Sequence, residues 1–154
     1  MIKVLFVCLG NICRSPMAEA ILADRVRVGG GAELFEIDSA GTGDYHIGEP
    51  PHRGTRGVLA RHDILYRGRA RQMTHEDLDH YDYIVAMDLR NLRDIEEQFG
   101  RAENVTLLLD YAPTLPEREV PDPYFSGDFE SVYSLIRLGV EGLLAHIIRE
   151  CELV

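Results

Sequence analysis

The chain has 154 residues, of which 45% are hydrophobic and 27% are charged, and its formal net charge is −10. These values are typical of a soluble globular protein with one core, and the excess of acidic residues argues against a nucleic-acid-binding surface. No apolar run approaches the roughly 20 residues that a membrane helix needs, and the first residues lack the layout of a signal peptide. We therefore expect a cytoplasmic protein that contacts neither nucleic acid nor a membrane.

Strands and helices alternate along the sequence. Runs of apolar residues predict strands at residues 2–7, 35–40, 83–87 and 105–109. Capping residues and amphipathic patterns predict helices that begin after Ser15, Pro51, Thr74 and Asp88, and a last helix at residues 129–148. The pattern leaves residues 69–73 ambiguous.

This alternation predicts an α/β fold with a parallel sheet and helices on both of its faces. We expect one domain, a three-layer sandwich whose four strands have the order 2-1-3-4, as in flavodoxin-like folds. Ligands of such sheets bind beyond the carboxyl ends of the strands, at the switch point beside the first strand. The segment that follows residues 2–7 lies there.

That segment, Cys8-Leu9-Gly10-Asn11-Ile12-Cys13-Arg14-Ser15, has the composition of an anion site. Backbone N–H groups from Leu9 to Arg14 can turn toward one centre, and a helix N-terminus follows directly. Gly10 and Asn11 tolerate the left-handed backbone that such a turn requires. The Arg14 guanidinium can donate two hydrogen bonds to a tetrahedral oxyanion. We therefore predict a phosphate or another oxyanion bound against the Cys8 thiol.

A thiol in this setting ionises easily and can attack phosphorus. A buried, inert cysteine is the alternative interpretation, because a cysteine followed six residues later by an arginine is common by chance. Its place between a buried strand and a helix start favours function. The segment is not a nucleotide-binding P-loop, since no Gly-Lys-Ser/Thr follows.

A phenolate is a poor leaving group, so cleavage of an aryl phosphate needs a proton donor. Asp122 is the best-placed candidate, between Pro121 and Pro123 on a proline-rich loop. The alternative is a solvated turn aspartate, which proline-flanked acidic residues often are.

With Asp122-Pro123-Tyr124 near the C-terminus, the segment from Val7 to Pro16 resembles the low-molecular-weight protein tyrosine phosphatases. Further matches to that family's pattern are Ser39-Ala40-Gly41-Thr42, Pro50-Pro51, Ala70-Arg71-Gln72, Met87-Asp88 and Asn91-Leu92. The similarity covers essentially the whole chain, so we expect residues 1–154 to form one such phosphatase domain.

The resemblance implies a role for each matching residue. It implies Cys8 as nucleophile, Arg14 as phosphate clamp and Asp122 as general acid and then general base. Ser15 would hydrogen-bond the thiolate, while Asn11 and Ser39 would brace the loop. Tyr45 and Tyr124 match positions that wall the slot for the substrate ring, and we expect Ile12 and Phe125 to line it as well.

The resemblance further implies a phosphotyrosine-containing protein as substrate, and a reaction without metal or cofactor. Cys13 could pair reversibly with Cys8 on oxidation, although a packed thiol is an equal alternative.

Two departures from the family's pattern are Phe125, where many members carry a second tyrosine, and Gly68-Arg69, where a histidine often precedes the matching segment.

A protein-arginine phosphatase is the second hypothesis, but those relatives typically carry threonine where Ile12 stands. An arsenate reductase would need two further cysteines, and only Cys151 remains. A phosphate-binding carrier would not need Asp122.

Overall fold

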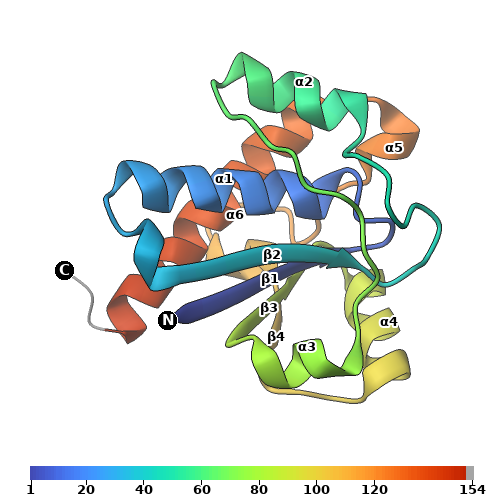
Figure 1. Ribbon diagram of the computed structural model, residues 1–154, viewed down its shortest axis with the longest axis vertical. Helices are drawn as coiled ribbons and strands as arrows, with labels where there is room; N and C mark the ends of the chain where they lie inside the picture. The colour runs from blue at the N-terminus through green and yellow to red at the C-terminus, as the bar shows by residue number, and fades with distance from the viewer. Residues whose placement is uncertain (152–154) are drawn as a thin grey trace.

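The computed structural model describes residues 1–151 and contains a four-stranded parallel sheet (Figure 1). Its strands are β1 (Ile2–Cys8), β2 (Phe35–Gly41), β3 (Tyr83–Ala86) and β4 (Val105–Leu107). The strand order β2-β1-β3-β4 is the predicted one. The helices are α1 (Arg14–Val28), α2 (Arg53–Arg61), α3 (His75–His80), α4 (Leu89–Phe99), α5 (Pro123–Ser126) and α6 (Phe129–Glu150), with 3₁₀ turns η1 (Ala32–Leu34) and η2 (Leu108–Tyr111).

Strand β1 lies in the middle of the sheet and packs on both faces. Val4 and Phe6 belong to the larger core cluster, which α1 and α6 cover, whereas Leu5 and Val7 face the smaller cluster toward α4. Figure 1 shows α1, α2 and α6 on one side of the sheet and α3 and α4 on the other. Successive strand residues point to opposite faces, so an unbroken apolar run is what a strand between two helical layers requires. The predicted three-layer architecture is confirmed.

Helix α6 bears on the expectation that no apolar run is long enough to cross a membrane. Its 22 residues contain a window with a mean hydropathy of 1.3, so by length and composition this helix could cross a membrane. Seven of its residues, among them Ile136, Val140 and Leu143, are buried. The stripe that packs against α1 and η2 is therefore what makes the helix so apolar.

Two elements near the C-terminal half differ from the prediction. The fourth strand ends at Leu107 instead of residue 109, and the chain turns into η2. Leu108 and Leu109 both pack into the larger core cluster, which consecutive residues of a strand cannot do because their side chains alternate. The short helix α5 was not predicted, since four residues carry no periodic pattern.

Candidate active site

The Cys8 thiol lies at the carboxyl end of β1 and is almost fully buried, with 3% of the residue exposed. Its Sγ accepts the backbone N–H of Asn11 at 3.3 Å and lies 3.0 Å from Ser15 Oγ. Two polar groups therefore contact the sulfur, one from the loop that joins β1 to α1 and one from the first turn of α1.

The loop around the sulfur holds backbone donors without acceptors. In the described chain, the N–H groups of Leu9, Gly10, Ile12 and Cys13 make no hydrogen bond, whereas that of Asn11 is donated to Cys8 Sγ. Nearly all buried N–H groups in proteins find a partner. A set of unpaired donors beside a thiol, at the start of α1, is therefore suited to an anion.

Asn11 holds the loop in shape. Its φ of 58° is left-handed, as the sequence predicts, whereas Gly10 does not have a positive φ. The Asn11 amide donates to Ser15 Oγ at 2.8 Å and to Ser39 Oγ at 3.0 Å, and its Oδ1 accepts the Arg71 N–H at 3.0 Å. All hydrogen-bonding groups of this buried amide but one lone pair are thus used.

Ser15 does not cap α1, which corrects the prediction. The helix begins at Arg14, Cys13 occupies the N-cap position, and no side chain caps it. The Ser15 hydroxyl is instead taken up by Asn11 and Cys8 inside the loop. A capping pattern and a loop-bracing pattern use the same residue types, so the sequence could not separate them.

Arg14 is buried and anchored along one edge. Its Nη1 donates to Asp88 Oδ2 at 2.7 Å and to the Val120 carbonyl at 2.9 Å. Burial alone would lower the pKa of Arg14, but the Cys8 sulfur and the Asp88 carboxylate raise it above its ordinary value. Within residues 1–151 no hydrogen bond uses Nε or Nη2, so one edge of the guanidinium is left to hold two oxygens of an anion.

Asp88 was predicted only as the N-cap of α4. One carboxylate oxygen does cap the helix, accepting the Asn91 N–H at 2.7 Å, while the other binds Arg14. The second role depends on a contact between residues 74 positions apart. No local pattern could reveal it.

Asp122 approaches the same arginine from the opposite end of the chain. Its Oδ2 lies 3.7 Å from Arg14 Nη2, and its Oδ1 accepts the Tyr124 N–H at 3.0 Å, which caps α5. The structure therefore brings the predicted acid to the predicted phosphate clamp. Asp122 is therefore more than a solvated turn residue, because its carboxylate also faces the site.

A cavity of about 340 Å³ opens above Cys8 and Arg14, and Asp122 lies in its wall. Its mouth carries three largely exposed rings, those of Tyr45, Tyr124 and Phe125. Ile12 and Cys13 line the cavity as well, whereas Asn11, Ser15 and Ser39 do not and act from beneath it. Leu9 and Gly10 complete the lining.

His46 also lines the cavity, and the sequence analysis missed it. Its ring lies 6.0 Å from that of Tyr124, and a side chain on Gly10 would come within 2.9 Å of its Cδ2 atom. Gly10 therefore provides room for this ring rather than a left-handed turn. His46 follows Tyr45 directly in the sequence, but one histidine in a loop is not a specific signal of a site.

Cys13 is a neutral thiol. Burial, the Cys8 sulfur and Asp122 together raise its pKa to about 12, against an opposing effect of Arg14. The two cysteines are therefore close enough to interact electrostatically, and the protonated Cys13 thiol is not suited to be the nucleophile.

Known proteins are similar to this one along nearly the whole chain. A low molecular weight protein-tyrosine-phosphatase of Bacillus subtilis, YfkJ, is 49% identical over 99% of this chain and 100% of its own length. The YfkJ crystal structure matches with a TM-score of 0.94 over 97% of this chain and 96% of that one.

Two further structures are similar. A protein tyrosine phosphatase from Entamoeba histolytica with Hepes in the active site has a TM-score of 0.90 and 32% identity, covering 99% and 100% of the two chains. A Drosophila arginine phosphatase has a TM-score of 0.86 and 34% identity, covering 95% and 98%. Residues 3–153 match the family described as low molecular weight phosphotyrosine protein phosphatase, and the chain belongs to that family.

Proposed function

We propose that this protein hydrolyses phosphotyrosine in protein substrates through a cysteinyl-phosphate, without a metal or a cofactor. The Cys8 thiolate attacks phosphorus, and the bond from phosphorus to the phenol oxygen breaks. Asp122 gives its proton to the departing oxygen. The Asp122 carboxylate then takes a proton from water, whose oxygen attacks the phosphocysteine, and phosphate and the thiolate are released.

One observation carries this proposal: a buried thiol, unpaired N–H donors and the open edge of Arg14 share one cavity with an acid. The donors around Cys8 suit the equatorial oxygens of a transferring phosphoryl group, which carry the charge of the transition state. Asp122 supports cleavage rather than storage of phosphate, since a carrier needs no proton donor. Hepes contains a sulfonate, and its position in the Entamoeba enzyme is consistent with an oxyanion site.

The exposed aromatic rings at the mouth support a phosphotyrosine side chain as the group that enters. Tyr45 and Tyr124 provide apolar walls for a phenyl ring, while the phosphate reaches the loop below. Residues 1–154 would act as one phosphatase domain. A cytoplasmic site of action stays a prediction.

A protein-arginine phosphatase is the second candidate, because the Drosophila enzyme has a closely similar fold. Ile12 argues for the aryl substrate. Its apolar side chain lines the cavity and packs with Cys13, Ala70 and Phe129. It offers no hydrogen-bonding group to the guanidinium of phosphoarginine, which would be left unpaired on binding.

The test compares an aryl phosphate with a phosphoarginine compound, using the wild-type protein and the Cys8→Ser and Asp122→Ala variants. We expect hydrolysis of the aryl phosphate, its loss in Cys8→Ser, and a strong decrease of kcat in Asp122→Ala. Absence of aryl phosphate hydrolysis would refute the proposal. Faster hydrolysis of phosphoarginine would favour the second candidate.

The pH dependence provides an independent check. The thiolate of Cys8 and the protonated form of Asp122 must coexist, so we expect a maximum on the acidic side of neutrality. A rate that rises steadily to about pH 9 would contradict the assignment of Asp122.

A further inference from the structure

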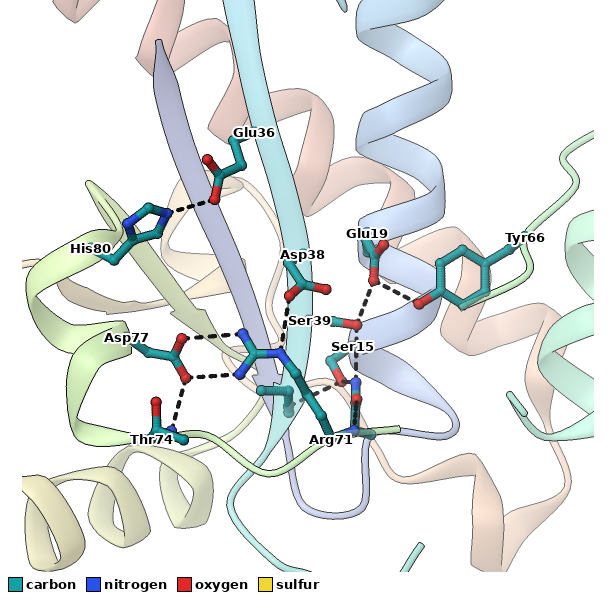
Figure 2. Close-up of polar contacts among 12 residues, drawn as sticks. Ser15, Glu19, Glu36, Asp38, Ser39, Tyr66, Arg71, Thr74, Asp77 and His80 are labelled. Carbon is teal, nitrogen blue, oxygen red and sulfur yellow. Dashed lines mark hydrogen bonds and ion pairs between the residues drawn. The ribbon is translucent and has the colours of Figure 1, made fainter. Parts of the chain in front are cut away.

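Outside the cavity, a second set of polar side chains contacts Ser39, one of the residues that support the nucleophile loop. Glu19 follows Ser15 by one turn of α1 and is half-buried. Its Oε1 accepts two hydrogen bonds, from Ser39 Oγ at 2.6 Å and from the Tyr66 hydroxyl at 2.7 Å. Figure 2 shows Tyr66 reaching this carboxylate from one side and Ser39 from the other. None of these contacts involves a residue of the cavity wall.

Tyr66 comes from the irregular segment between α2 and α3. Its ring packs against the larger core cluster, and its hydroxyl passes over Gly68. A Cβ atom at position 68 would lie 2.0 Å from that hydroxyl oxygen. Tyr66 can thus reach Glu19 only because residue 68 has no side chain. Gly68 is also a position at which the sequence departs from the family's pattern.

The donors and acceptors of this network have a single consistent direction. Because Ser39 donates its one proton to Glu19, its oxygen is left to accept from the Asn11 amide. The other N–H of that amide goes to Ser15 Oγ. Ser15 then accepts from Asn11, and its own proton can point to Cys8 Sγ at 3.0 Å. The competing acceptor, the Ala40 carbonyl, is more distant at 3.4 Å.

The Arg71 N–H fixes the Asn11 amide as the donor to both serines, and the charge state of Glu19 decides whether Ser39 can donate to Glu19. Burial raises the pKa of Glu19, while the hydrogen bonds from Ser39 and Tyr66 oppose that effect. The pKa of Tyr66 is raised by burial and then by Glu19, so its hydroxyl stays a donor. Without Tyr66 the buried carboxylate loses a donor and takes up a proton more readily. A protonated Glu19 can donate to Ser39 itself, which disrupts the order of the network.

We propose that Tyr66 is a positioning residue for the nucleophile. By holding Glu19 as a hydrogen-bond acceptor, it keeps the Ser39 oxygen free to accept from the Asn11 amide, which also donates to Ser15, so that the Ser15 hydroxyl donates to Cys8. Tyr66 touches neither the sulfur nor the substrate cavity and acts through four intervening residues. The inference rests on the proposed function, because it assigns the orientation of the same thiolate.

The experiment uses Tyr66→Phe, which removes one oxygen and keeps the ring. The matched control is Tyr111→Phe. Tyr111 is equally half-buried in the same core cluster, and among residues 1–151 its hydroxyl bonds only Thr106, at 2.9 Å. All variants carry Cys151→Ser, since Cys151 is exposed and would react with alkylating reagents. Two readouts are measured: kcat and KM for an aryl phosphate, and the pH profile of Cys8 alkylation by iodoacetamide.

We expect Tyr66→Phe to lower kcat by about 3- to 10-fold, the effect of one hydrogen bond to a charged group, with KM changed by less than about 2-fold. The midpoint of the alkylation profile is expected to move upward by about half a pH unit. Tyr111→Phe is expected to leave both readouts unchanged. Gly68→Ala, which displaces the hydroxyl by another route, is expected to reproduce the changes of Tyr66→Phe.

Wild-type kcat and an unshifted alkylation profile in Tyr66→Phe would overturn the inference, as would equal effects of Tyr111→Phe. A failure of the proposed function can be distinguished from a failure of the inference about Tyr66. If the wild-type protein does not hydrolyse the aryl phosphate, the function is refuted, whereas the alkylation profile still tests Tyr66 because it needs no turnover.

Discussion

Substitution of Asn11 tests how much of the stability of the fold is stored in the nucleophile loop. Asn11 has a φ of 58° and uses its side chain in three hydrogen bonds, to Ser15, Ser39 and the Arg71 N–H. Each such bond contributes about 1 kcal/mol net, so removing the amide costs about 3 kcal/mol. An alanine in the left-handed region adds about 1 kcal/mol. We expect Asn11→Ala to lose about 4 kcal/mol of unfolding free energy.

Two variants separate these contributions. Asn11→Gly loses the hydrogen bonds but tolerates the backbone, so we expect a loss of about 3 kcal/mol, which makes glycine the more stable of the two replacements. Asp63 also has a left-handed φ, of 61°, but it is exposed and its side chain makes no hydrogen bond within residues 1–151. Asp63→Ala is therefore the control for the backbone alone, with an expected loss of about 1 kcal/mol.

The measurement is urea unfolding at one fixed pH, followed by circular dichroism. A loss in Asn11→Ala no larger than that in Asp63→Ala would refute the reasoning, because it would mean that the three hydrogen bonds contribute nothing net. A glycine variant less stable than the alanine variant would refute the argument from the backbone.

Three further predictions concern the site. Arg14→Lys keeps the charge, but one ammonium cannot bind Asp88, the Val120 carbonyl and two phosphate oxygens together. We expect kcat/KM for an aryl phosphate to fall at least about 100-fold, and a loss below about 5-fold would contradict this reasoning. Burial raises the pKa of Glu19, so its carboxyl group keeps its proton to a higher pH in the folded state than in the unfolded chain, and the free energy of unfolding falls as pH rises from about 4 toward neutrality. Glu19→Gln is expected to remove this part of the pH dependence of unfolding. Peroxide oxidises Cys8 to a sulfenic acid, which the Cys13 thiol can convert to a disulfide with release of water. Cys13→Ser is therefore expected to recover less activity after reduction by a thiol, and unchanged recovery would exclude this pairing.

The sheet and its order could be predicted because each signal is local. The run from Ile2 to Val7 is apolar on both faces, and β1 indeed contacts both core clusters. Asp88 caps α4 as predicted, since capping depends on neighbours in the sequence. The nucleophile loop was recognisable for the same reason, as its residues lie within eight positions.

The supports of the loop could not be predicted in this way. Ser15 was assigned to a helix cap because its hydroxyl partners, Asn11 and Cys8, have no signature distinct from a cap. Tyr66 and Glu19 are 47 positions apart, and Arg14 and Asp88 are 74 apart. Contacts of this kind arise from the packing of α1 and of the long loops against the sheet. No pattern within one segment records them.

The central claim is that phosphate is transferred to Cys8, and trapping that intermediate tests it most directly. Asp122→Ala is mixed with an activated aryl phosphate, whose phenolate leaves without a proton donor, and the reaction is quenched with acid within one turnover. Loss of the general base slows hydrolysis of the intermediate. Mass spectrometry of the peptide that contains Cys8 is expected to show one added phosphoryl group. An aryl phosphate consumed at the same rate by a Cys8→Ser variant, with no phosphorylated Cys8 peptide in Asp122→Ala, would contradict the account.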